Sequence, residues 1–411
     1  MGKSANVPMV MYHSIVDAND GWQFRHLSCP VSIFESHLKA LRWANFHTIS
    51  LQMLYKYMVE GKEIPSRSVV LTFDDGYLDN WIYAYPLLKK YGWHGTIFVN
   101  PDFVDPVESL RPNLEDVWNG RISMHDLPTS GFLSWQEMRE MENSGYIDIQ
   151  SHGLTHTWYF SSPEIMDFHH PGDLYPWLAW NAHPERKHLW MTEDQQSFVP
   201  WGTPIYQHEK SLATRRYFPD EDLDAVLMDY VRSHGNETFF QSVGWRQRLE
   251  QVATDYRQTH NSRGHFESDA EYKARLHREL AGSKQMIESQ LDKTVDFLCW
   301  PGGGYNDTSV ELSKEVGYLA SAHSSHDQGI KKNRFGEDPS RWSRIFPPWF
   351  IWSETRVEYK GGLYLICLLN SVRGSYLYTV MYKALRIPFK LSQWVGPSSL
   401  KHPDSSGIET R

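Results

Sequence analysis

Cysteine is scarce in this sequence. The 411 residues include only three, Cys29, Cys299 and Cys367, which lie far apart and form no C-x-x-C pair. An odd number of widely spaced cysteines excludes a disulfide framework and a thiolate zinc site. The same pattern is typical of a reducing compartment.

An excess of basic residues is also lacking. Lys and Arg number 41 against 50 Asp and Glu, which gives a formal net charge of −9. Because binding to a nucleic-acid backbone requires clustered basic residues, we expect no nucleic-acid partner. The N-terminal stretch MGKSANVPMVMYHSIVD has no apolar segment like that of a signal peptide. We therefore expect a cytoplasmic protein.

Long uninterrupted apolar runs are missing too. The most apolar segment, residues 361–395, is interrupted by Asn370, Arg373 and Gly374, and is too broken to span a membrane. Two interpretations stay open: helices packed on the rest of the protein, or an amphipathic segment bound peripherally at the inner face of the membrane. We predict a helical segment over 351–396 and a disordered tail over 397–411.

The rest of the chain alternates between strand and helix patterns. Short apolar runs typical of strands occur at residues 8–13, 68–73, 95–99, 146–150 and 295–300, with amphipathic helical patterns between several of them. This alternation predicts an α/β fold with a parallel sheet or barrel.

Two adjacent carboxylates end one of these buried strands. In SVVLTFDDG, five strand-forming residues lead directly to Asp74 and Asp75. Two partly desolvated carboxylates repel each other unless a cation or a proton lies between them. The pair therefore indicates either a surface turn or a cation site.

Two histidines follow the strand at 146–150. His152 and His156, in SHGLTH, are spaced so that both imidazoles can reach one metal ion. Together with Asp75 they form a set of two histidines and one carboxylate, which leaves coordination positions open for water and substrate. Because functional groups collect at the carboxyl ends of barrel strands, we expect these residues to meet.

These motifs resemble those of the NodB-like polysaccharide deacetylases, carbohydrate esterase family 4. TFDDG and SHGLTH are similar to the first two motifs of that family. The resemblance implies that Asp75, His152 and His156 bind one divalent metal ion, zinc first and cobalt, nickel or manganese as alternatives. It also implies that Asp74 is the general base.

The third motif of the family, R-x-P-x-G, is similar to CWPGG, where Pro301 and Gly303 are in place. The resemblance assigns the backbone N–H of Gly302 to the oxyanion of the reaction. Cys299 stands where the family has an arginine that tethers the base, so Arg341 or Arg344 is the candidate substitute.

A fourth motif, L-x-H, normally supplies the general acid near the C-terminus, and no convincing copy is found there. MYH at residues 11–13 resembles the version that lies near the N-terminus in the poly-N-acetylglucosamine deacetylase branch. His13 is therefore the candidate acid, and a buried structural histidine is the alternative.

The resemblance implies a distorted (β/α) barrel of about seven strands, formed by residues 1–156 and 271–350, with a large insertion and a C-terminal helical extension. Residues 157–270, rich in Pro, Trp and His, form the insertion. We expect it to cover the active-site groove, because aromatic rings commonly line sugar-binding sites, and peripheral packing is the alternative.

The function implied is hydrolytic removal of N-acetyl groups from an N-acetylated sugar, in a polysaccharide or a lipid-linked glycan, by metal-activated water with an Asp base and a His acid. Two alternatives stay open. The missing arginine is compatible with a catalytically impaired carbohydrate-binding relative. The same site chemistry would also permit an amidase acting on a non-sugar amide.

Overall fold

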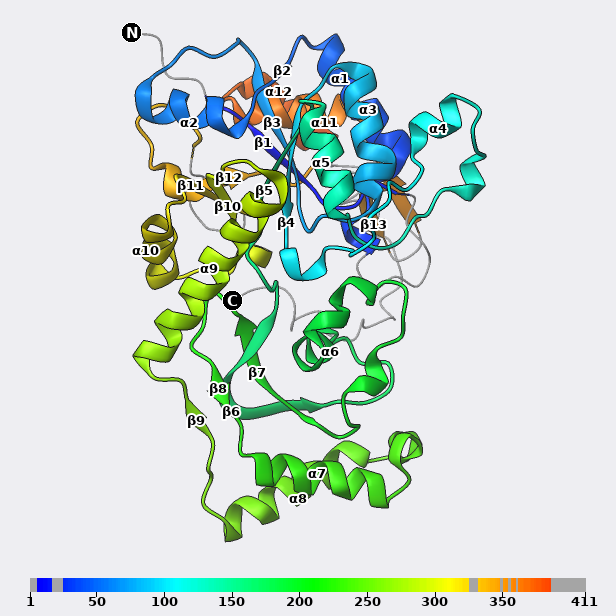
Figure 1. The fold of residues 1–411 in the computed structure, drawn as a ribbon, viewed down its shortest axis with the longest axis vertical. Coiled ribbons are helices and arrows are strands. Elements are labelled where there is room, and N and C mark those ends of the chain that lie inside the picture. The colour runs from blue at the N-terminus through cyan, green and yellow to red at the C-terminus, as the bar shows by residue number, and fades with distance from the viewer. Residues whose placement is uncertain are drawn as a thin grey trace.

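A computed structural model describes most of the chain (Figure 1). Seven parallel strands form a nearly closed barrel, as predicted. The strands, in spatial order, are β1 (Met9–Tyr12), β3 (Ser68–Phe73), β4 (Gly95–Val99), β5 (Ile147–Ser151), β10 (Phe297–Cys299), β11 (Ala320–Ser324) and β12 (Trp342–Arg344). The residues described are 6–16, 25–324, 332–347, 350–353, 356–359 and 361–385.

The barrel closes between its first and last strands. The Met11 N–H donates to the Ile345 carbonyl at 2.9 Å, and the Ile345 N–H donates to the Met9 carbonyl at 2.8 Å. A short strand, β2 (His47–Thr48), pairs with β3 outside this circuit. The two ends of the barrel sequence therefore lie side by side.

Helices surround the barrel. Helix α5 begins at a capping box formed by Ser134 and Glu137, whose side chains each accept a hydrogen bond from the other's backbone N–H, and the chain then turns at Gly145. The helices of this layer are α1 (Val31–Trp43), α2 (Leu51–Glu60), α3 (Tyr85–Tyr91), which continues a π-helical turn at Asn80–Ala84, α4 (Leu114–Trp118), α5 (Trp135–Asn143), α9 (Asp269–Leu291) and α10 (Asp307–Val316).

Alternation along β3 decides which side chains face the barrel interior. Val69, Leu71 and Phe73 belong to the core shared with the helices. Val70 belongs to a second cluster with side chains of neighbouring strands. Because side chains alternate along a strand, Asp74 continues the inward side at the carboxyl end of β3.

Residues 157–270, the predicted insertion, are built on a pair of long antiparallel strands, called the hairpin below. Strand β6 (Trp158–Phe168) pairs antiparallel with β7 (Pro204–Lys210), and Figure 1 shows this hairpin between the barrel and the pair α7–α8. Residues 169–203 separate the two strands along the chain. The remaining elements are α6 (Trp177–Ala182), β8 (Tyr217–Phe218), α7 (Glu221–Ser233), α8 (Trp245–Thr259) and β9 (His265–Phe266).

Residues 351–396 are predicted to be helical, but the structure begins this segment with two strands. Strands β13 (Phe350–Ser353) and β14 (Arg356–Tyr359) form an antiparallel pair, because these stretches are rich in aromatic and branched residues that favour strands. Helices α11 (Gly362–Val372) and α12 (Tyr376–Ala384) follow. Residues 386–396 and the predicted tail at 397–411 lie outside the described residues.

Helices α11 and α12 differ in burial. Leu365, Ile366 and Leu369 of α11 are buried in the same core as α1, whereas no described residue of α12 is buried. In the part of the chain that the structure describes, no helix has the length and apolar character needed to cross a membrane.

Candidate active site

The three predicted metal ligands meet at one end of the barrel. Asp75 follows β3, His152 follows β5, and His156 lies in the loop after it. Oδ1 of Asp75 is 3.3 Å from Nε2 of His152 and 3.3 Å from Nε2 of His156. The structure thus brings together the carboxylate and both imidazoles, with the distal ring nitrogens converging on one oxygen.

Unusual backbone geometry directs these side chains. Asp75 and His156 have φ values of 71° and 42°, in the left-handed region that non-glycine residues rarely adopt. Gly76 follows with φ 69°, and a Cβ there would lie 3.1 Å from Val99. Such strain is found where a site requires a particular orientation.

The polar atoms of the cluster fit a divalent metal ion. Nδ1 of His152 lies 2.9 Å from the Cys299 carbonyl oxygen, which can only accept, so Nδ1 carries the proton and Nε2 is left as a ligand. Burial lowers the pKa of His156 to about 4, which keeps this imidazole neutral as metal binding requires. Oδ1 of Asp75 is buried and has no hydrogen-bond donor among the described residues.

Asp74 is paired with an arginine that lies 270 residues later in the sequence. Nη1 of Arg344 lies 2.6 Å from Oδ1 of Asp74, and Nη2 lies 2.8 Å from Oδ2. Both side chains are buried. Of the two candidate arginines, Arg344 is therefore the one that makes the bidentate contact with Asp74.

This contact controls the charge of Asp74. Burial by itself would raise the pKa of the carboxyl, but the Arg344 guanidinium, helped by His152 and His13, outweighs burial and lowers it. Asp74 is therefore ionised at neutral pH and able to accept a proton.

Cys299 lies at the position of the missing arginine and contacts Asp74 only weakly. Its Sγ is 3.8 Å from Oδ2 of Asp74. Asp74, His152 and Cys299 form a second group close enough to hold a metal ion. This group is the poorer site, because Asp74 is already paired with Arg344 and burial raises the pKa of the Cys299 thiol above its usual value.

His13 also lies beside Asp74, and its Nε2 is 3.8 Å from Oδ2 of that residue. Its carbonyl accepts a hydrogen bond from the Asn80 amide at 2.8 Å. The next two residues are held by Asp79, which accepts from the Ser14 hydroxyl at 2.5 Å and from the Ile15 N–H at 2.9 Å. The segment that carries His13 is thus fixed to the turn that follows the two aspartates.

The residues expected to supply the oxyanion site form a short turn after β10. Pro301–Gly303 is a 3-10 turn in which Gly302 has φ 52°. A Cβ added to Gly153, in the histidine loop, would lie 3.3 Å from Pro301. The turn therefore lies next to the histidine loop, on the same rim of the barrel.

Two features of the site escaped the sequence analysis in whole or in part. Arg344 was one of two candidates, and only the parallel pairing of β11 with β12 brings it to Asp74. The contacts of Asp79 and Asn80 with residues 13–15 were not predicted. The sequence DDGYLDN, in which two further polar residues follow the aspartate pair, could have indicated them.

Comparison with known families bears on the same segment. Residues 61–185 match the family model described as polysaccharide deacetylase. This segment of the chain is similar to a polysaccharide deacetylase domain. The matched residues include Asp74, Asp75, His152 and His156, and they end inside the insertion.

Among the relatives of this chain is the polysaccharide deacetylase YxkH of Bacillus subtilis (strain 168), 32% identical over 154 residues, which are 38% of this chain and 44% of that protein. The poly-beta-1,6-N-acetyl-D-glucosamine N-deacetylase of Escherichia coli (strain K12) is 25% identical over 309 residues, which are 75% of this chain and 32% of that protein. The chain thus spans less than half the length of either relative.

A solved structure has the same fold. The de-N-acetylase from Aggregatibacter actinomycetemcomitans has a TM-score of 0.50 and 20% sequence identity, and the match covers 83% of this chain and 94% of that chain. The shared architecture extends well beyond residues 61–185, to the whole barrel.

Proposed function

We propose that this protein is a metal-dependent hydrolase that removes N-acetyl groups from an N-acetylated glycan. The observation that carries the proposal is the convergence of Asp75, His152 and His156 beside the Asp74–Arg344 pair. The similarity to a polysaccharide deacetylase domain and the names of the relatives support the same chemistry.

Asp75, His152 and His156 would hold the metal ion, for which zinc fits a set of two imidazoles and one carboxylate. When bound, the ion supplies Lewis acidity, which polarises a carbonyl and lowers the pKa of a coordinated water. The open coordination positions of such a three-ligand set are compatible with hydrolysis.

The remaining groups handle protons. Asp74, kept ionised by Arg344, accepts a proton from the attacking water. His13, beside Asp74, donates a proton to the departing amine. The backbone N–H of Gly302 stabilises the tetrahedral oxyanion. The products are acetate and a free amino sugar.

The binding-protein alternative rested on the missing arginine at position 299. The Arg344 contact with Asp74 provides that cation from another strand and removes the reason for expecting an impaired site. We therefore favour an active enzyme. Among glycans, we propose one that contains N-acetylglucosamine, because relatives are named for that sugar.

We also propose that the protein works at the inner face of a membrane, in contact with it through α12. This helix exposes Tyr376, Leu377, Val380 and Met381, and Lys383 lies in its last turn. Apolar residues beside basic ones suit an anionic lipid surface. Glycans carried on lipids at that face are then accessible substrates.

The deciding experiment measures metal content and acetate release on one purified sample, with β-1,6-linked N-acetylglucosamine oligomers as substrate. We expect about one zinc ion per chain and acetate release. His152→Ala should lose both, because one of three ligands is gone, whereas Asp74→Asn should keep the metal and lose at least a hundredfold in kcat.

Metal binding without acetate release from any glycan would argue for a non-sugar amide as substrate. Near-normal turnover by Asp74→Asn would contradict the role of the base. A protein that binds oligomers but binds no metal, even after reconstitution with zinc, would be a carbohydrate-binding relative.

A further inference from the structure

The insertion places a lysine at the edge of the candidate active site. Lys210 is the last residue of β7 and pairs across the hairpin with Trp158. Directly opposite residues of an antiparallel pair have their side chains on the same face. The Trp158 ring lies 5.7 Å from the ring of the metal-ligand candidate His156. Lys210 is therefore separated from this ligand by one aromatic side chain.

The lysine side chain lies directly on the turn expected to bind the oxyanion. A Cβ added to Gly302 would lie 2.7 Å from Cε of Lys210, and one added to Gly304 would lie 2.5 Å from its Cβ. Any larger residue at either position would collide with this side chain. The Lys210 side chain thus explains why positions 302 and 304 are glycine.

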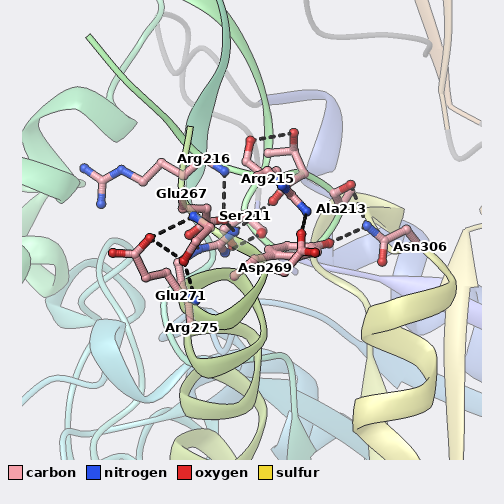
Figure 2. Close-up of polar contacts among 12 residues, drawn as sticks. Ser211, Ala213, Arg215, Arg216, Glu267, Asp269, Glu271, Arg275 and Asn306 are labelled. Carbon is pink, nitrogen blue, oxygen red and sulfur yellow. Dashed lines mark hydrogen bonds and ion pairs between the residues drawn. The ribbon is translucent and has the colours of Figure 1, made fainter. Parts of the chain in front are cut away.

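The backbone around Lys210 is held by many bonds. The Ser211 N–H donates to the Thr157 carbonyl at 2.9 Å, which continues the hairpin. Figure 2 shows the segment after it: buried Arg275 donates to the Ser211 carbonyl at 2.7 Å, and the Asn306 amide donates to the Ala213 carbonyl at 2.9 Å. These contacts join the insertion to α9 and to the start of α10.

The amine of Lys210 has no hydrogen-bond or ion-pair partner among the described residues. In the described ranges, no carboxylate forms an ion pair with it and no oxygen accepts a hydrogen bond from it. Burial lowers the pKa of the ammonium group, and neighbouring Glu209 offsets this only in part. Since Nζ of Lys210 is not fully buried, an acceptor that arrives from solvent can reach this amine, and the backbone that carries it is well anchored.

The reacting centre itself is not that acceptor. The largest charge effects on the pKa values of Asp74 and Asp75 come from Arg344 and the histidines. Lys210 lies against the 301–304 turn and opposite Trp158, beside the reacting centre and not within it.

We propose that Lys210 is a substrate-binding residue that donates hydrogen bonds to hydroxyl oxygens of the sugar next to the N-acetylated unit under attack. The inference rests on the proposed function for the identity of the glycan. It makes the insertion a determinant of specificity, since it supplies the residue that requires a substrate longer than one sugar.

The test uses Lys210→Met, which keeps the apolar stem over Gly302 and removes the amine. Binding of a β-1,6-linked N-acetylglucosamine tetramer is measured by calorimetry in the Asp74→Asn background, with zinc present. Loss of a charged hydrogen bond should weaken binding about tenfold or more. In the enzyme with Asp74 intact, KM for the tetramer should rise by the same factor, with kcat within about twofold and Tm unchanged.

Lys273→Met, which removes an exposed lysine of α9, is the matched control and should leave binding and KM unchanged. Equal tetramer binding with and without the Lys210 amine, or no binding to either protein, would overturn the inference. If the wild-type protein releases no acetate but Lys210→Met still weakens binding, the inference holds and the proposed function fails.

Discussion

At the scale of single residues, Arg344 brings a positive charge to Asp74 from a different strand than the family pattern would use. Its guanidinium reaches Asp74 from β12, although the family pattern places the arginine on β10, where this chain has Cys299. A buried carboxylate without a cation would take up a proton and could not act as a base. A cation on β12 thus pairs with Asp74 in this chain, where the family pattern would use one on β10.

We predict that Arg344→Met lowers kcat at least a hundredfold and costs about 3–5 kcal/mol of stability, because it leaves a buried carboxylate unpaired. Arg344→Lys should be intermediate, since lysine cannot make the bidentate contact. Because Arg344 lowers the pKa of Asp74, its loss should move the acidic limb of the kcat/KM profile to higher pH. Steady-state kinetics across pH and urea unfolding measure these effects.

The matched control is Arg341→Met, which removes the other candidate arginine. In the described part of the chain Arg341 makes no hydrogen bond with Asp74, so we expect wild-type kinetics. Equal losses in the two variants would mean that Arg344 has no special role in the site.

At the scale of elements, the insertion depends on one buried network where it joins α9 (Figure 2). Arg275 donates to both carboxylate oxygens of Glu267, at 3.1 and 2.6 Å, and to the carbonyls of Ser211 and Thr214. Both charged side chains are almost fully buried. The network joins the segment before β8 and the segment after β9 to one helix.

We predict that Arg275→Met costs about 3–5 kcal/mol, because Glu267 is left as an unpaired buried charge. It should also raise KM for the tetramer, since the segment that fixes Lys210 loses its anchor. Urea unfolding and steady-state kinetics report the two effects. The exposed neighbour Arg278, changed to Met, should alter neither quantity, and an Arg275 variant that behaves like this control would contradict the network's role.

The same elements show what the sequence could predict. Five of the barrel strands, β1, β3, β4, β5 and β10, and the residues at their ends were predictable, because local periodicity and short motifs determine them. The roles of the site residues stay predictions. Arg344 and Lys210 reach their places only through long-range pairing, β11 with β12 and β6 with β7, which leaves no local pattern. The division of the chain into domains also stays a prediction.

At the scale of the whole molecule, the C-terminal helices extend the barrel's outer layer. Helix α11 completes the core over α1, and Gly362 allows this approach, because a Cβ there would lie 2.5 Å from the Ser36 carbonyl oxygen. Helix α12 has no fully buried residue, although Tyr378 is partly buried against the core, and it exposes Leu377 and Val380 at 65% and 46%. The apolar exposure of the pair thus lies mainly on α12.

We predict cosedimentation with vesicles that contain anionic lipid, and its loss on changing Leu377 and Val380 to Asp together. Point changes are preferable to deletion of 361–395, which would uncover the α1 core. Val243→Asp, at a fully exposed valine of the insertion, is the control and should bind as the wild type does. Protein that stays in the supernatant, or a double variant that still binds, would contradict the membrane contact.

The closure of the barrel has a consequence for biosynthesis. Asp74 is close to His13, which follows the first barrel strand, and to Arg344, which ends the last one. A nascent chain that stops short of Arg344 would already contain TFDDG, SHGLTH and CWPGG. It would still lack the cation that pairs with Asp74. A product truncated before Arg344 would therefore carry every recognisable motif without the arginine on which the proposed base depends.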